Sequence, residues 1–404
     1  MTCSNKQTTR RRRAILCRAI SLPALPGRAF WLGCGLVGAL MPAATFAAPG
    51  PIQKDFADAD ILTTLPDSST GSATAPANAT ELADQLQAFI SQARGTGDPR
   101  FLGYAERLLE DWPEAQLTDR LRVLRATLAQ SLHRFEAARA DLEQVLADTN
   151  QRQQRIQARL TLANLELVQG HYQAARRQCD ALTRDYPGLI AESCLAQMQA
   201  RTGEGAEAYA RLQNRLAAAP GADPTSRAWA QGTLGDIAAQ LGREAATEHW
   251  QAVLRDAPTD LYTRALLADW HLERGNYRAT LDLTASYEQV DGLGVLRAIA
   301  LQQVAPEQAR HLTQALRARF EEAQWRGALL HQRDFARFLL DIEQRPEPAL
   351  EHAWANWREQ REPLDTRLVL RAAMAAQDQD VVQEVRQWLR QQGQTDSRYP
   401  EMPQ

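Results

Sequence analysis

A short corner between two amphipathic segments recurs along this chain, and its spacing limits the folds that the chain can adopt. Each corner follows an apolar stripe at helical spacing and precedes another one. The corners begin at His133, Gly170, Gly203, Gly242 and Gly275, which are 37, 33, 39 and 33 residues apart. The two long intervals carry extra polar residues, DTNQRQ and GADPTS, so the underlying period is about 34 residues. Self-similarity at such a period is typical of stacked helical hairpins.

Small and aromatic residues keep fixed places around these corners. One unit contains Ala163, Gly170, Tyr172, Ala175, Leu182 and Pro187, and parts of the same set recur in the units before and after it. Two helices approach to about 8–10 Å only where the facing side chains are small. A corner glycine closes the first helix in the left-handed conformation, and a proline stops the second helix.

This arrangement resembles the tetratricopeptide repeat (TPR), most clearly across residues 119–292. The resemblance implies an all-α fold, a right-handed superhelical solenoid of stacked antiparallel helix pairs. We expect TPR-like repeats over 80–292, divergent helical repeats and a C-terminal cap over 293–392, and a disordered tail over 393–404. A closed helix bundle with alanine-rich faces is the alternative.

The N-terminus carries the pattern of an export signal. Residues 1–47 contain seven Lys and Arg residues and no acid, and they include the apolar stretch AFWLGCGLVGAL. Twelve residues of helix rise only about 18 Å, which is short of a hydrocarbon core of roughly 30 Å. We therefore predict a signal peptide over 1–47, cleaved after Ala47, and a flexible arm over 48–79. An uncleaved anchor formed by residues 29–48 is the alternative.

Charge and cysteine usage indicate the compartment and exclude one class of ligand. Beyond the basic leader the chain is acidic, so it has no electrostatic reason to bind nucleic acid. Lysine occurs only at positions 6 and 54, with arginine used elsewhere, as expected for a GC-rich bacterium. Export to the periplasm would leave Cys179 and Cys194 as the two cysteines, and an oxidising compartment permits a disulfide between them. Two separate thiols remain the alternative.

No motif for catalysis, metals or cofactors is found. No two of the seven histidines are three or four residues apart, and none has metal-ligand spacing to a cysteine. Paired carboxylates such as Glu347 and Glu351 leave open an α/α-barrel enzyme, for example a glycosidase. Many other acids are one helical turn from an arginine, which is typical of a solvated helix face. We expect no catalysis, no metal and no cofactor.

The first helix of each unit lines the concave surface of such a solenoid, where partners bind. The resemblance transfers this groove to Thr127, Gln130, Asn164, Gln197, Arg201, Trp229, Asp236, Tyr262, Asp269 and Glu273. Trp229 and Tyr262 are candidate anchors, unless they pack between units. The acids Asp236, Asp269 and Glu273 would suit a basic or arginine-containing peptide.

These features predict an exported, periplasmic TPR-type scaffold that binds a protein or peptide partner in its concave groove. The rivals are the α/α-type enzyme, which needs a deep pocket with two convergent carboxylates, and a membrane-anchored assembly component. The anchored component differs only in whether residues 29–48 survive in the mature chain.

Overall fold

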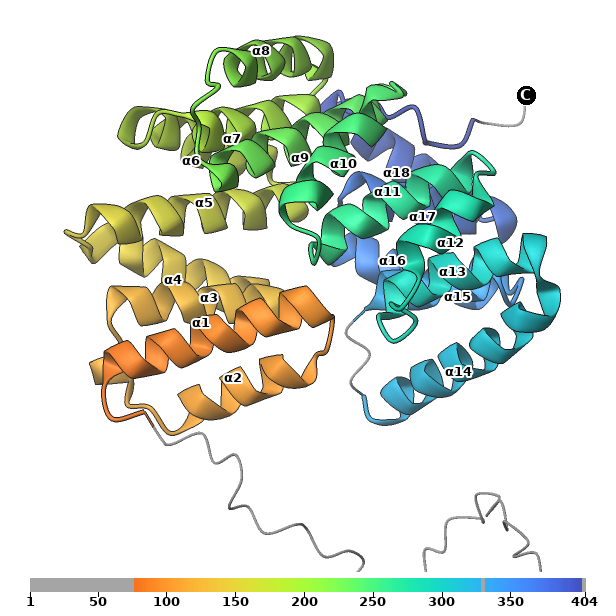
Figure 1. Cartoon of the computed structure of the whole chain (residues 1–404), viewed down its shortest axis with the longest axis horizontal. Helices are drawn as coiled ribbons and strands as arrows, with labels where there is room; N and C mark the ends of the chain where they lie inside the picture. The colour runs from red at the N-terminus through yellow and green to blue at the C-terminus, as the bar shows by residue number, and fades with distance from the viewer. Residues whose placement is uncertain (1–75, 328–330, 402–404) are drawn as a thin grey trace, which may run out of the picture. The chain divides into compact units, whose positions relative to one another are not determined.

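Antiparallel helix pairs follow one another along the chain in the computed structural model, which describes residues 76–327 and 331–401 (Figure 1). Eighteen α-helices and one short 3-10 turn, Glu114–Gln116, make up this part, and it contains no strand. The first four pairs are α1 (Ala79–Thr96) with α2 (Arg100–Glu110), α3 (Asp119–Ser131) with α4 (Phe135–Asp148), α5 (Arg152–Val168) with α6 (Tyr172–Asp185), and α7 (Leu189–Ala200) with α8 (Gly205–Ala217).

The remaining pairs continue the same pattern. They are α9 (Pro224–Gln240) with α10 (Ala245–Asp256), α11 (Leu261–Glu273) with α12 (Tyr277–Thr284), α13 (Asp291–Val304) with α14 (Pro306–Trp325), α15 (Gln332–Asp341) with α16 (Pro346–Glu359), and α17 (Pro363–Ala375) with α18 (Gln379–Gln392). Partners within a pair pack together, and successive pairs pack in sequence order. The structure therefore confirms the all-α, TPR-like stack of helix pairs. The predicted signal peptide and nearly all of the predicted arm lie outside the described residues.

The corners have the backbone conformation that their sequence predicts. All five corner residues have positive φ, from 57° at His133 to 92° at Gly203. This left-handed region favours glycine, so His133 is the one strained corner among them. We refer to the five pairs that contain these corners, α3–α12, as the regular units.

Small side chains lie where the helices of the regular units cross. Ala126, Ala163, Ala175 and Ala208 are all fully buried. Gly235 has a particular reason to lack a side chain, because a Cβ there would be 2.5 Å from Nε1 of Trp250. In the pair α9–α10, the glycine on one helix thus makes room for the tryptophan on the other.

A disulfide joins two successive units. Cys179 on α6 and Cys194 on α7 are bonded at an S–S distance of 2.06 Å, and both residues are buried. Their Cα atoms are 5.5 Å apart, within the usual range for such a bridge. The bond therefore fixes the crossing between the second and third regular units.

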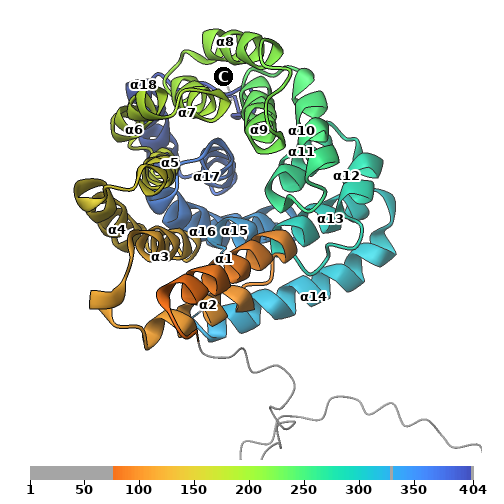
Figure 2. The ribbon, with the colours of Figure 1, turned by 60° about the vertical axis from the view of Figure 1, so that its left-hand side comes forward.

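The last helices pack against the inner side of the regular units. In Figure 2, α17 lies inside the curve formed by α5, α7, α9 and α11. The largest buried cluster joins Tyr172 and Cys179 of α6 to Trp357 and Trp388 of α16 and α18. The chain's own C-terminal helices thus occupy much of the surface that the resemblance assigned to a partner.

Four successive corners contact the C-terminal part of the chain in sequence order. The contacts are Gln360 at His133, Arg361 and Trp388 at Gly170, Gly393 at Gly203, and Ser397 at Gly242. The fifth corner, Gly275, has no such neighbour, since a Cβ there would meet nothing within 4 Å. Besides turning the backbone, the corner glycines at 170, 203 and 242 thus leave room for the C-terminal segment to pack against them.

Residues 393–401, the tail segment, correct one prediction. We expected a disordered tail from 393, but Gln394 and Asp396 are buried. The Ser397 amide donates to the Gln240 carbonyl at 2.9 Å, and Gln240 Nε2 donates to the Thr395 carbonyl at 2.7 Å. These hydrogen bonds, which the polar composition of the tail segment did not reveal, hold it against α9.

Candidate functional site

A cavity of about 610 Å³ remains between the first unit, the middle units and the C-terminal helices. Residues of α1, α11, α13, α15 and α17 form most of its wall, and we call it the central cavity. It is closed on one side where α1 ends, because Gly97 packs against Val290 and Leu261 so closely that a Cβ would be 2.8 Å from a Val290 methyl. Its volume falls in the usual range of ligand sites, roughly 300–1,000 Å³.

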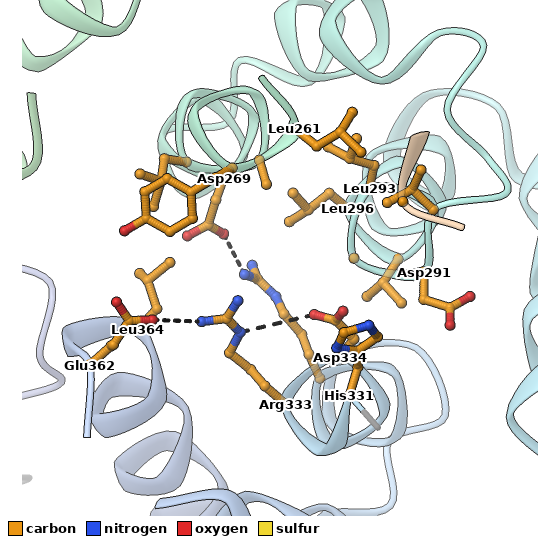
Figure 3. Close-up of a pocket in the computed structure, with 18 of the residues that line it drawn as sticks. Leu261, Asp269, Asp291, Leu293, Leu296, His331, Arg333, Asp334, Glu362 and Leu364 are labelled. Atoms are coloured by element: carbon orange, nitrogen blue, oxygen red, sulfur yellow. Dashed lines mark hydrogen bonds and ion pairs between the residues drawn. The ribbon is translucent and has the colours of Figure 1, made fainter. Parts of the chain in front are cut away.

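The wall of the central cavity has an apolar side and a charged side. Leu261, Leu293 and Leu296 cluster together, across the cavity from Arg333 and Glu362 (Figure 3). Arg333 is 3.7 Å from Glu362 and 3.5 Å from Asp365. Burial alone would lower the pKa of the guanidinium, but the nearby carboxylates raise it and keep Arg333 charged. The cavity thus presents an apolar surface and a set of fixed charges to anything inside it.

Two of the predicted groove acids are already paired with the chain's own arginines. Asp269 accepts hydrogen bonds from Arg337 and, at 2.6 Å, from Arg367, and Glu273 accepts from Arg337 at 3.1 Å. Burial opposes ionisation of Asp269, but the two guanidinium groups outweigh it and hold the pKa of the carboxyl below its usual range. The chain's own arginines therefore balance the charge of Asp269 and Glu273, and attraction of a basic peptide by these acids stays a prediction.

Asp236 and Arg201 line the central cavity without pairing to each other. Asp236 accepts a hydrogen bond from Trp250 Nε1 at 3.0 Å, and burial raises the pKa of its carboxyl to about 6. Arg201 is 6% exposed, and its Nη1 donates to Gln240 Oε1 at 3.0 Å. Both side chains therefore keep unused hydrogen-bonding capacity.

The two candidate aromatic anchors remain accessible. Trp229 on α9 is 39% exposed and Tyr262 on α11 is 51% exposed. They are 33 residues apart, so they hold equivalent places in successive units. Tyr262 lines the central cavity. The alternative that both rings are buried between units is not what the structure shows.

Four of the ten predicted groove residues, Arg201, Asp236, Tyr262 and Asp269, lie together in the wall of the central cavity. Thr127, Gln130, Asn164, Gln197, Trp229 and Glu273 do not line it. Thr127 donates to the Val123 carbonyl of its own helix at 2.8 Å, and Asn164 is exposed. The groove positions on α3 and α5 thus stay outside this site.

Sequence reasoning missed the partners that the C-terminal helices supply. Arg333 and Arg337 on α15, Arg367 on α17, and Leu293 and Leu296 on α13 all line the central cavity. None of them belongs to a repeat motif. The available signal was the concentration of arginines one turn from acids, which we interpreted as a solvated face.

Carboxylates of raised pKa do occur in the cavity wall. Burial, helped by the charge of Asp334, raises the pKa of Asp291, while Arg319 donates to it at 3.0 Å. The pKa of Asp236, which burial also raises, depends on different neighbours, among them Trp250 and Arg201. Glu347 and Glu351, the pair noted in the sequence, are exposed.

The described residues offer neither a cluster of metal ligands nor a membrane-spanning helix. Among residues 76–327 and 331–401, no group of three or more His, Cys, Asp or Glu side chains is placed to hold a metal ion. In the same part of the chain, no helix combines the length and apolarity needed to cross a bilayer.

Comparison with known proteins identifies no family for this chain. No family model matches the sequence, and no curated protein matches it. Among the solved structures that match is a crystal structure of the P58(IPK) TPR domain, at 14% identity, covering 78% of this chain and 89% of that one, with a TM-score of 0.20. Because that score is so low, the fold assignment rests on the helix pairs and corners described above.

Proposed function

We propose that this protein is an exported, periplasmic TPR-type scaffold that binds a protein or peptide partner and performs no catalysis. The observation that carries the proposal is the pair of accessible aromatic side chains, Trp229 and Tyr262, at equivalent places on α9 and α11. The partner docks there, because the C-terminal helices already occupy much of the inner surface.

Physical chemistry favours these two positions as anchors. Tyrosine and tryptophan are enriched among the residues that dominate binding energy at interfaces. Helix pairs that are packed before binding lose little conformational entropy when a partner docks. Since Asp269 and Glu273 are neutralised internally, aromatic contact rather than acidic attraction selects the partner.

Export is supported by two independent features. The leader over 1–47 has the composition of a secretory signal. The only cysteines of the described residues are joined in a disulfide, a bond that persists in oxidising compartments. Sequencing the mature N-terminus tests this part, and we expect it to begin at Ala48. A mature chain that begins at Met1 would favour the membrane-anchored component.

Site-specific cross-linking tests the docking surface. A photo-reactive residue placed at Trp229 in the intact cell envelope is expected to capture one partner. The same residue at Trp325, which is 86% exposed on α14, is the control and should capture little. Trp229→Ala and Tyr262→Ala should each reduce capture at the other position. Equal capture at 229 and 325 would contradict the proposed surface.

An enzyme of the α/α type has one observation in its favour. Asp291 and Asp334 both line the central cavity, and Asp334 contributes to the raised pKa of Asp291. We expect no glycoside-hydrolysing activity, because the Asp291 carboxylate already accepts a hydrogen bond from Arg319 and is not free to act on a substrate. Activity that is lost in both Asp291→Asn and Asp334→Asn would establish the enzyme instead.

A further inference from the structure

Two opposite charges in the wall of the central cavity have no counter-charge bonded to them. Within the described residues, Arg201 forms no ion pair, and its one side-chain hydrogen bond goes to the neutral amide of Gln240. Asp236 likewise forms no ion pair, and only Trp250 donates to its carboxylate. Buried charges normally have bonded partners, because removing a charge from water is costly. Two charged groups that line a cavity and have no bonded counter-charge therefore indicate a site for a charged ligand.

The other charges near this end of the cavity are already satisfied by the chain itself. Arg398 is 2.6 Å from Asp396, and the Glu362 carboxylate accepts from the Asp365 backbone amide in the capping box at the start of α17. Arg333 lies between Glu362 and Asp365. Among Arg201, Asp236 and these neighbours, one positive and one negative group remain unmatched. Arg94 on α1, which also lines the cavity, likewise forms no ion pair within the described residues, but it is not among the charges that act on Asp236. A ligand that completes both must carry one charge of each sign.

The rest of the wall indicates what else the ligand contains. Leu261, Leu293 and Leu296 form the apolar side, and Tyr262 lies in the same wall with half of its surface accessible. Apolar side chains on the ligand would remove this surface from water, which is favourable by roughly 25 cal/mol per Å². The volume of about 610 Å³ exceeds what a single amino acid would fill.

We propose that the central cavity binds a short zwitterionic peptide of two or three residues with apolar side chains. Its terminal carboxylate accepts hydrogen bonds from Arg201, its terminal ammonium donates to Asp236, and its side chains contact the leucines of α11 and α13. This small ligand is distinct from the macromolecular partner that docks at Trp229 and Tyr262, although Tyr262 belongs to both sites.

Calorimetry on the full chain with three probes tests the charge recognition directly. The probes are leucyl-leucine, its N-acetyl derivative, which lacks the ammonium, and its C-terminal amide, which lacks the carboxylate. We expect leucyl-leucine to bind about tenfold more tightly than either blocked form, because each blocked form loses one charge-assisted hydrogen bond. Failure of leucyl-leucine to bind, or equal binding of all three, would overturn the proposal.

The variant Asp236→Asn separates recognition from stability. The asparagine oxygen still accepts from Trp250, so the fold is retained, but the negative charge is gone. The preference for leucyl-leucine over the N-acetyl form should fall to about one, while the preference over the amide remains. Asp282→Asn, at an exposed site on α12, is the control and should keep both preferences. A preference for the free ammonium that persists in Asp236→Asn would refute the role of Asp236.

The two proposals fail separately. Loss of peptide binding with cross-linking at Trp229 intact would leave the scaffold function standing. Peptide binding without a captured partner would leave the central cavity as the site and remove the docking surface.

Discussion

The regular units and the helices α13–α18 are both built of antiparallel pairs, yet different side chains hold each region together. In α3–α12 the helices cross on alanines such as Ala126 and Ala175, which are fully buried. In α13–α18 alanines such as Ala336 are also buried, but several aromatic rings pack together as well, with Phe320 and Phe335 at 5.0 Å and Trp357 and Trp388 at 5.4 Å between centroids. Small residues repeat and can be read from the sequence, whereas a unique aromatic core gives no period.

Breaking the ion pairs between the two regions should lower the free energy of unfolding more than any other change. Asp269→Ala removes the carboxylate that bonds both Arg337 and Arg367 and leaves two buried cations poorly matched. We expect a loss of about 3–5 kcal/mol in the free energy of unfolding, measured by denaturant titration. Asp282→Ala, at an exposed site on α12, should change it little, and equal losses would show that the regions are not joined through Asp269.

Within the regular units, the disulfide comes next. Cys179 and Cys194 are 15 residues apart, and a cross-link of that length contributes about 3 kcal/mol. Replacing both cysteines by serine should lower the unfolding free energy by that amount and leave α13–α18 assembled. Far-UV circular dichroism of the variant should stay helical at 25 °C. An unchanged midpoint would mean that the unfolded chain is not restrained by the bond.

The Asp236 carboxyl makes stability depend on pH. Burial raises its pKa to about 6, so the native state keeps a proton that the unfolded chain has lost between pH 4 and 6. Stability from this group is therefore full at low pH and falls as pH rises. Relative to wild type, Asp236→Asn should gain about 2 kcal/mol between pH 4 and pH 7, allowing for partial exposure. A constant difference between the two proteins would show that the carboxyl titrates normally.

Placing a larger side chain in a helix crossing should lower the free energy of unfolding by somewhat less than the changes above. Ala175→Phe places a ring in a fully buried crossing and should cost about 1–3 kcal/mol. Ala217→Phe, at the exposed end of α8, is the matched control. Equal melting temperatures for the two variants would contradict the register of the regular units.

A pair of corner glycines measures the smallest effect. Gly242 and Gly275 have nearly the same φ, 71° and 72°, but only Gly242 faces Ser397. Alanine at either corner carries the same backbone strain, so the extra loss in Gly242→Ala isolates contact with the tail segment. We expect that extra loss to be about 1 kcal/mol, from thermal unfolding. Identical losses of stability in the two variants would show that Ser397 can move aside without destabilising the fold.

The sequence predicted the helices, the pairs and the corners because those depend on local periodicity. It also placed Arg201, Asp236, Tyr262 and Asp269 on one surface, because equivalent positions in stacked units face the same way. It did not predict that Arg337 and Arg367 neutralise Asp269, nor that Gly393 contacts Gly203. Those contacts join segments far apart in the chain, and no repeat or local pattern records them.

The hydrogen bond between Gln240 and Thr395 spans 155 residues of sequence. A linear array whose units touch only their neighbours can melt from its ends, one unit at a time. Here the tail segment holds α9, a helix far from it in the sequence, so fraying of either would loosen the other. Heating should therefore give a single cooperative transition, and this stack should behave as one domain rather than as a row of separable modules.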